Sequence, residues 1–350
     1  MERSDKSRWR SFNGLGIGVS VFLSGVFILG LDGIHLPRAS AESEIYPAKK
    51  ITWVNPVKAG GSMDMVARTT ALHLPKYLKE VSKGAKGGDV VVENRSEAGG
   101  RRAYSAIYKA RPDGYTIGDF NPAFVAEELS TKLDIVVEKY TYLSRFGASG
   151  RVVVARTGGG FKTWDEMIQA GKTKEIKWGA SSFGRGHHVA SIMLKERFKL
   201  PIRLINFPGA TENENALLRG DIDVGMVAEE SAKPLIDAGK FRVLLVVGES
   251  AAQYPGAKTI GDLGAPDLVS PCLLQYVVIA PPNLPSDMAD VLMAALKGVY
   301  NDKEFQVQIK KLGFTPAPLY GQEAQELSFS IFKFVGGNAA IIKKYLSQTK

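Results

Sequence analysis

From residue 50 onward, short apolar runs alternate with segments whose apolar residues recur every three or four positions. The short runs predict strands and the other segments predict helices, because side chains alternate faces in a strand and return to one face about every 3.6 residues in a helix. Strands are expected over 51–54, 89–93, 115–119, 143–146, 152–155, 176–179, 203–207, 222–227, 243–247 and 275–280. Helices are expected after residue 62, over 100–110, 163–170, 188–198 and 213–218, after residue 232, and from residue 286 with a break at Gly336-Gly337. This alternation predicts the α/β class, with parallel-rich sheets that carry helices on both faces.

The chain is predicted to fold as two lobes. Two segments expected to be flexible, Gly147–Gly150 and Leu268–Cys272, interrupt the alternation. If both cross between lobes, residues 42–149 plus 275–350 form lobe 1 and residues 150–274 form lobe 2. Two crossings far apart in the sequence are typical of a hinged binding protein that closes around its ligand. The alternative, a single domain, would require one sheet with an unusually large number of strands.

Residues 1–41 differ from the rest of the chain. Four basic residues lie within Met1–Arg10, an apolar stretch runs from Leu15 to Leu31, and Ala39-Ser40-Ala41 ends the segment. This order predicts a signal peptide cleaved after Ala41, and therefore an exported, periplasmic protein. The alternative is a retained membrane anchor, although the apolar stretch is near the lower limit for spanning a bilayer.

Charge and cysteine content narrow the classes of ligand and fold. Lys and Arg outnumber Asp and Glu by 45 to 36, and the chain stays basic without residues 1–41. A moderate positive charge favours an anionic small molecule. The basic residues are dispersed, which disfavours nucleic acid. Cys272 is the only cysteine, so no intramolecular disulfide can form, and a chain of this length can bury its own core without one.

Four turns that contain or flank glycine follow strands or begin helices. They are Ala59–Ser62, Ala98–Gly100, Ala180–Gly186 and Phe207–Ala210. Ligands of open α/β sheets bind at the carboxyl ends of strands, and helix N-termini offer backbone N–H groups to anions. Two of the turns fall in each predicted lobe. We therefore expect them to face one another and to bind a carboxylate from both sides.

Polar side chains near these turns have more than one interpretation. Of His187 and His188, one is expected to face the ligand and the other to pack or be solvated, because adjacent helical positions diverge too far to chelate one metal well. Ser181 and Ser182 either cap the helix that follows or bind a carboxylate. Glu229 is either solvated or lines the cleft, where it would select an amine or hydroxyl of the ligand. No metal site and no cofactor are expected.

Five motifs in this order resemble one family. They are Pro56–Arg68, Val91–Arg95 followed by Ala98–Gly100, Pro112–Thr116, Ala180–His188, and Gly220–Val224. With these motifs the chain resembles Bug-type periplasmic substrate-binding proteins of tripartite tricarboxylate transporters. The resemblance covers essentially the whole mature chain.

This resemblance implies a two-lobe, type II venus-flytrap fold without catalysis. It implies that the loops 59–64 and 98–100 act as fingers on the carboxylate of an organic acid, partly through ordered water. The ligand contacts carried over by the resemblance are Ala59, Gly60, Gly61, Ser62, Asp64, Asn121, Ser181, Gly184, Gly186, His188, Pro208, Gly209 and Ala210.

The chain departs from the family pattern beside both fingers. Lys58, Arg101 and Arg102 add cations there, which suggests a ligand with at least two acidic groups, since charge-assisted hydrogen bonds are the stronger ones. The alternative is that these side chains are solvated at the rim, where ion pairs contribute little. Val57 and Phe183 border an aromatic ligand or merely pack.

Together with these observations, the resemblance implies a monomeric receptor that captures a di- or tricarboxylate anion by lobe closure and delivers it to integral membrane permease subunits. An exported α/β hydrolase is the alternative from another class, but the sequence has no Gly-x-Ser-x-Gly motif. The turn Ala59–Ser62 does not continue as Gly-Lys-Ser/Thr, which excludes a nucleotide phosphate loop there. A sensor with the same fold is the nearer alternative, and the sequence does not distinguish it from a transport receptor.

Overall fold

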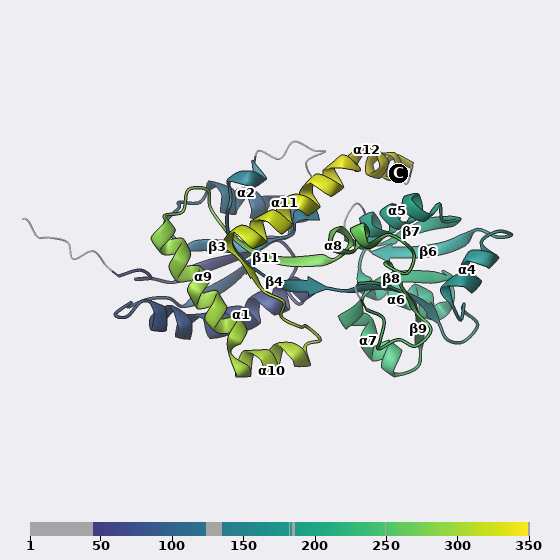
Figure 1. Ribbon diagram of the computed structural model, residues 1–350, viewed down its shortest axis with the longest axis horizontal. Helices are drawn as coiled ribbons and strands as arrows, with labels where there is room; N and C mark the ends of the chain where they lie inside the picture. Colours follow the sequence, from purple (N-terminus) through teal and green to yellow (C-terminus); the bar gives the residue numbers. More distant parts are fainter. Residues whose placement is uncertain (1–44, 124–134, 182, 184–185, 249, 349–350) are drawn as a thin grey trace, which may run out of the picture. The chain divides into compact units, whose positions relative to one another are not determined.

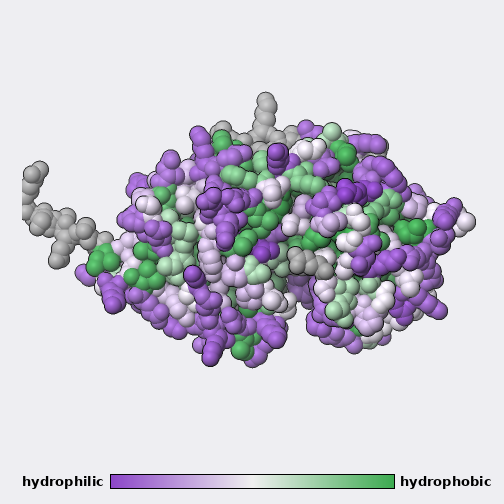
Figure 2. Space-filling model, in the orientation of Figure 1, coloured by the Kyte–Doolittle hydropathy of each residue, from purple (hydrophilic) through white to green (hydrophobic). Residues whose placement is uncertain are grey.

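The computed structural model describes residues 45–123, 135–181, 183, 186–248 and 250–348. The predicted signal peptide lies outside these residues, as do Ser182 and Gly184. Everything below concerns the compact unit Ser43–Lys350. Among the described residues, no helix combines the length and the apolar character needed to cross a bilayer. Hydrophilic side chains cover most of the face shown in Figure 2.

The first sheet has six strands in the order β12-β4-β11-β3-β1-β2. The strands are β1 (Ile51–Asn55), β2 (Val90–Asn94), β3 (Thr116–Phe120), β4 (Thr141–Ser149), β11 (Leu274–Ala280) and β12 (Leu319–Tyr320). β1 pairs in parallel with β2 and β3, with Trp53 opposite both Val92 and Ile117, whereas the pairs that involve β4 and β11 are antiparallel. The sheet is therefore mixed.

Helices cover both faces of this sheet (Figure 1). They include α1 (Ser62–Val81), α9 (Ser286–Asn301) and α10 (Lys303–Lys311), and also α2 (Arg101–Lys109), which follows the 3₁₀ turn η1 (Glu97–Gly100). Trp53 packs in the cluster that contains residues of α1 and α9, and Val54 packs in the cluster that contains residues of α2. Successive residues of a strand point to opposite faces, so a continuous apolar run marks a strand that is buried on both sides.

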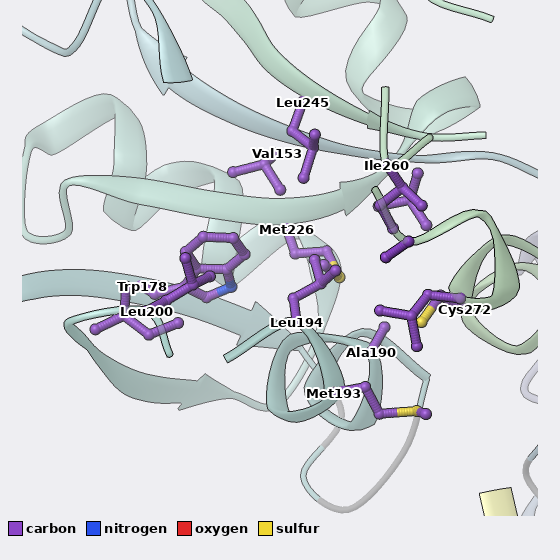
Figure 3. Close-up of a cluster of buried hydrophobic side chains, with 14 of the residues drawn as sticks. Val153, Trp178, Ala190, Met193, Leu194, Leu200, Met226, Leu245, Ile260 and Cys272 are labelled. Carbon is purple, nitrogen blue, oxygen red and sulfur yellow. The ribbon is translucent and has the colours of Figure 1, made fainter. Parts of the chain in front are cut away.

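The second sheet has the order β10-β9-β5-β8-β6-β7 and is also mixed. Its strands are β5 (Arg151–Arg156), β6 (Ile176–Ser181), β7 (Ile202–Phe207), β8 (Val224–Ala228), β9 (Phe241–Val247) and β10 (Lys258–Thr259). Its helices are α4 (Trp164–Ala170), α5 (Gly186–Phe198), α6 (Ala210–Arg219) and α7 (Glu229–Asp237). Val153 and Trp178 pack with Cys272 in the core shown in Figure 3.

Both segments expected to be flexible have regular secondary structure. β4 continues to Ser149 and β5 begins at Arg151, which leaves Gly150 alone between them. Residues 147–149 are held by ladder pairing with 274–276 of β11. The second segment forms the 3₁₀ turn η4 (Pro266–Leu268) and the short helix α8 (Val269–Cys272), and its apolar side chains are buried in the second sheet's core. The expectation of loops here was wrong because long-range pairing and burial fix the backbone.

The C-terminal helices add a connection that was not expected. α11 (Gly321–Gly337) packs against β4 and α8, and α12 (Ala339–Gln348) packs against α5 (Figure 1). Ile331, Val335 and Ile342 belong to the same core cluster as Trp178. The break at Gly336-Gly337 is confirmed, since α11 ends there. The assignment of all of 275–350 to lobe 1 stays a prediction, and the end of this range packs with the second sheet's core.

Candidate functional site

A cavity of about 340 Å³ lies where residues at strand ends and helix starts from both sheets meet. We call it the first cavity. From the first sheet and its loops it is lined by Pro56, Val57, Lys58, Ser62, Ser96, Ser149 and Leu274, and from the second by Arg151, Gly186, His187, Pro208 and Ala228. Ser62 and Gly186 therefore lie on one cavity, as expected for loops that converge from both halves.

Four helices begin at this cavity. Ser62 is the first residue of α1, Gly186 is the first residue of α5, and Ala228 is the N-cap of α7. Pro208 immediately precedes Gly209, the N-cap of α6. The N-cap residues of α1, α6 and α7 make no capping hydrogen bond with their side chains. Each helix N-terminus carries roughly half a positive charge and unpaired N–H groups, so the cavity wall favours an anion.

Asp64 holds the first loop in shape. Its carboxylate accepts hydrogen bonds from Gly60 N (2.9 Å), Arg68 Nε (2.9 Å) and Asn94 Nδ2 (2.7 Å). Burial opposes ionisation of Asp64, but the Arg68, Gly60 and Asn94 hydrogen bonds lower its pKa below the usual value. The side chain is only 2% exposed and lies inside the loop rather than on the cavity wall. The predicted contact residues Ala59, Gly60 and Gly61 are exposed between the lining residues Lys58 and Ser62.

The second loop packs directly on the first. Gly100 has φ of +84°, and a Cβ there would lie 2.7 Å from Pro56 Cβ and 2.8 Å from Pro56 O. Only glycine fits both this conformation and this contact. Ser96 lines the cavity, but Arg101 and Arg102 do not: Arg101 is half-buried and Arg102 is exposed beyond the lining. Of the three predicted cations, Lys58 alone lies on the wall.

The two histidines of α5 point in different directions. His187 lines the cavity, and its Nδ1 lies 2.8 Å from Ser181 Oγ. His188 is completely buried, with Nε2 3.3 Å from Asn206 Nδ2 and its ring 5.2 Å from that of Phe183. Burial, reinforced by the Arg151 cation, lowers the pKa of His187 to about 3, so its ring is neutral at physiological pH. The structure places His187 on the wall, whereas the family resemblance named His188.

Arg151 and Tyr276 are the polar residues that sequence reasoning missed. Arg151 begins β5, is only 3% exposed and lines the first cavity. Tyr276 of β11 is 1% exposed, and its hydroxyl has no hydrogen-bond partner within the described part of the chain. The hydroxyl lies near Ser62 and Ser149, both on the cavity wall. In the sequence, Arg151 stands at the start of an apolar strand, just after the expected crossing between lobes. This position is the signal that could have identified Arg151 as a site residue.

Glu229 and Glu230 line a second cavity of about 370 Å³, which shares Ser149 with the first. Glu229 accepts hydrogen bonds from Tyr254 Oη (2.8 Å) and Gln253. Glu230 accepts one from Ser149 Oγ. Burial raises the pKa of Glu230. Glu229 therefore lies on this second cavity and not on the first, and its predicted contact with the ligand stays a prediction.

Four further predicted site residues lie outside the lining of the first cavity. Asn121 is completely buried; it donates to Gln275 O (3.2 Å) and accepts from Ala123 N (3.0 Å). Phe183 is 46% exposed and does not line the first cavity. Gly209 and Ala210 are half-buried beside Pro208. Among the residues that the structure describes, no group of three His, Cys, Asp or Glu side chains could hold a metal ion. Direct ligand contact by the predicted residues stays a prediction.

Comparison with known proteins adds the family. A family model described as "Tripartite tricarboxylate transporter family receptor" matches residues 76–345. A UPF0065 protein of Bordetella pertussis is 26% identical over 80% of this chain and 85% of its own.

Two solved structures share the two-lobe periplasmic-binding-protein fold. A TctC solute-binding protein from Polaromonas has a TM-score of 0.70 at 19% identity and covers 85% of this chain and 99% of its own. MatC from Rhodopseudomonas palustris, with bound malate, has a TM-score of 0.64 at 20% identity and covers 86% of this chain and 100% of its own.

Proposed function

Because the chain belongs to the tripartite tricarboxylate transporter receptor family, we propose that it is a periplasmic receptor that binds a small organic-acid anion in the first cavity. It delivers this anion to the membrane subunits of a tripartite transporter. The observation that carries the proposal is the meeting of four helix N-termini and the buried Arg151 at one cavity. The bound malate of MatC is consistent with a carboxylate of this size class.

The first cavity can bind a carboxylate through backbone groups that are already in place. The N–H groups at the start of α1 come from the first sheet's side, and those of α5, α6 and α7 come from the second. A ligand held by both sides stabilises the arrangement in which the two sides are close, because it binds that arrangement more tightly. Asp64 and Gly100 keep the two loops of the first side in shape, which reduces the entropy lost on binding.

The geometry disfavours catalysis by the Ser181–His187 pair. A nucleophilic serine needs a histidine that takes up its proton near neutral pH. Burial and the adjacent Arg151 cation lower the pKa of His187 to about 3, which makes this ring a weak base. An arginine is also the opposite of the carboxylate that orients and supports the histidine in hydrolases.

Binding and turnover are separated by one experiment on the mature protein. We expect thermal unfolding to shift upward with a subset of di- and tricarboxylates, since a ligand that binds the native state raises stability by mass action. Chromatography of the same mixtures should recover the acid unchanged. Consumption of the acid would favour the hydrolase alternative, and the absence of any shift across a broad carboxylate set would overturn the receptor proposal.

Delivery to a transporter needs a separate measurement. Uptake of the labelled acid should fall in cells that lack this receptor and return when the gene is restored. Binding in vitro without any effect on uptake would point to the sensor alternative.

A further inference from the structure

We propose that Ser191 and Asn213 are positioning residues for the first cavity. Neither side chain lines the cavity. Each fixes one helix, α5 or α6, to the second sheet, and so holds the N-terminus of that helix at the cavity wall. The inference rests on the proposed function and names two residues on which the geometry of the same site depends.

Two consecutive residues of β6 face the two helices. Successive residues of a strand face opposite sides of a sheet, and Trp178 is followed by Gly179. Trp178 packs in the core that contains Ala190 and Leu194 of α5 (Figure 3). Gly179 faces α6, since a Cβ there would overlap the side chain of Asn213. Both helices begin at the first cavity, so β6 is a common support for two parts of its wall.

The side chain of Asn213 lies over two glycines of the sheet. Gly179 of β6 is directly opposite Gly225 of β8 in the ladder. A Cβ at Gly179 would overlap Asn213 Oδ1, and a Cβ at Gly225 would lie 3.5 Å from it. Glycine inside a strand permits such a close approach. The Asn213 side chain is completely buried, and its Nδ2 donates to Met226 O of β8 at 3.0 Å.

The stability of the fold does not account for this amide. Asn213 Oδ1 is buried and has no hydrogen-bond partner in the described part of the chain. A buried polar atom without a partner costs free energy, so an apolar side chain would fill the same space at a lower cost. The amide adds a directional bond from α6 to β8, one helical turn after the N-cap Gly209. Because Pro208 before that cap lines the cavity, Asn213 positions this helix N-terminus.

Ser191 makes the corresponding contact for α5. It is completely buried, and its Oγ accepts from Trp178 Nε1 at 2.8 Å and donates to His187 O at 2.7 Å. A serine that bonds the carbonyl four residues earlier does not by itself stabilise a helix. Here the same hydroxyl also connects that carbonyl to the buried indole of β6. Because His187 lines the first cavity, the Trp178–Ser191 bond fixes a wall residue at the start of α5.

The wall on the second sheet's side therefore depends on buried hydrogen bonds behind it. Groups that bind a ligand must be held within about 0.5 Å of their productive positions by residues whose own conformations are fixed. When either contact is lost, the helix can shift on the sheet and its N–H groups no longer point to the same place. Anion binding then weakens, although no group on the cavity wall has been replaced.

Two matched pairs of variants test the α6 contact. Asn213→Ala is paired with Asn215→Ala, because Asn215 is an exposed asparagine of the same helix. Gly179→Ala is paired with Gly225→Ala. The added methyl overlaps Asn213 at the first position and meets only ordinary van der Waals contacts at the second.

One matched pair tests the α5 contact. Ser191→Ala is paired with Ser328→Ala, because Ser328 is also a buried helical serine and its Oγ donates to Ala324 O, four residues earlier, at 2.7 Å. Ser328 belongs to α11 and does not line the first cavity. The pair therefore separates the loss of a buried hydroxyl from the loss of the bond to β6.

Three quantities are measured for each variant. Calorimetry gives the affinity for a panel of mono-, di- and tricarboxylates that includes malate, adipate and citrate. Urea denaturation gives the stability and establishes that the variant is folded. Hydrogen–deuterium exchange, measured without any acid, reports how firmly α5 and α6 are held.

We expect Asn213→Ala, Gly179→Ala and Ser191→Ala each to weaken the tightest-binding acid of the panel about tenfold, roughly the value of one hydrogen bond to a charged group. Asn215→Ala and Gly225→Ala should stay within about twofold of the wild type, as substitutions without a specific contact do. Ser191→Ala and Ser328→Ala should lose similar stability, but only Ser191→Ala should lose affinity. Exchange should rise in α6 of Asn213→Ala and in α5 of Ser191→Ala.

Unchanged affinity in folded Asn213→Ala and Ser191→Ala would overturn the inference. An equal loss of affinity in Ser191→Ala and Ser328→Ala would also overturn it, because it would show a general effect of lost stability. Should Gly179→Ala fail to fold, Asn213→Ala decides. A wild type that binds no acid of the panel would refute the proposed function. Unaltered exchange in α5 and α6 would refute the positioning role even then, since exchange is measured without acid.

Discussion

Two cavities of similar volume, about 340 and 370 Å³, share Ser149 in their linings, and they differ in charge and in how their donors are held. The first is lined by helix N-termini and the buried Arg151, whereas the second is lined by Glu229 and Glu230 together with lysines. The same helix contributes to both, since the N-cap of α7 lies on the first cavity and its first turn lies on the second. Volume therefore does not identify the anion site; the net charge of the wall does, because the two glutamates of the second cavity are matched in number by Lys233 and Lys310, whereas the first cavity has only basic charged residues on its wall.

The cavities also differ in rigidity. The first is shaped by backbone that Asp64 and Gly100 fix in place. The second is lined largely by long side chains that already have partners, such as Glu229 with Tyr254 and Lys233 with Asp237. Fixed donors lose little entropy when a ligand binds, which is a second reason to place the ligand in the first cavity.

Removal of the Asp64 carboxylate should have the largest effect on the first cavity. In Asp64→Ala the Gly60 N–H loses its acceptor, the half-buried Asn94 amide keeps only Val57 O, and Arg68 keeps only Asn94 Oδ1. We expect the free energy of unfolding to fall by about 2–4 kcal/mol, measured by urea denaturation at pH 7, together with weaker anion binding. Asp165→Ala at an exposed position serves as control.

The pH dependence gives an independent reading of Asp64. Because its pKa is lowered in the folded state, its contribution to stability is present above the ordinary aspartate pKa and is lost as the pH falls toward the lowered value. Asp64→Asn should lack this part of the acid dependence. An identical acid profile in the variant and the wild type would contradict the assigned network.

A matched pair of glycines tests the contact between the two loops. Gly60 and Gly100 share a φ of +84°, but a Cβ at Gly60 would meet nothing within 4 Å, whereas at Gly100 it would meet Pro56. Gly60→Ala should lower the free energy of unfolding by about 1–2 kcal/mol for the left-handed conformation. Gly100→Ala should cost about 1–3 kcal/mol more because of the clash, measured under the same conditions. Equal costs would mean that the loop moves away from Pro56 without penalty.

Neutralising Glu230 should produce the smallest effect on anion binding. It tests the difference in charge between the two cavities. Glu230 lies near Arg151, and burial raises its pKa. As the pH rises through that pKa, the added negative charge should weaken anion binding. We expect Glu230→Gln to tighten binding by about two- to fivefold at pH 7–8 and to flatten the pH dependence, as measured by calorimetry. The control is Glu229→Gln, because the Glu229 carboxylate accepts from Tyr254 and Gln253; this variant should change neither the affinity for the anion nor its pH dependence. Weaker anion binding in Glu230→Gln would contradict the charge argument.

The amino-acid sequence by itself determined the elements and the class of the fold. Its apolar periodicity indicated β1, β3, β6 and the helices between strands, and Gly60 and Gly100 marked turns with the left-handed backbone that the structure shows. These features depend on neighbours within a few residues, so they can be read along the chain. The family resemblance to tripartite tricarboxylate receptors was confirmed for the same reason, since its motifs are local.

Only the tertiary structure decided which side chains face the first cavity. It placed His187 rather than His188 on the wall, left Arg101 and Arg102 outside the lining, and buried Arg151 in it. It also made residues 147–149 of the expected loop part of a paired strand, because Ser149 lies opposite Leu274. Such contacts join residues far apart in the sequence. They depend on how helices and sheets pack, and local periodicity contains no record of that packing.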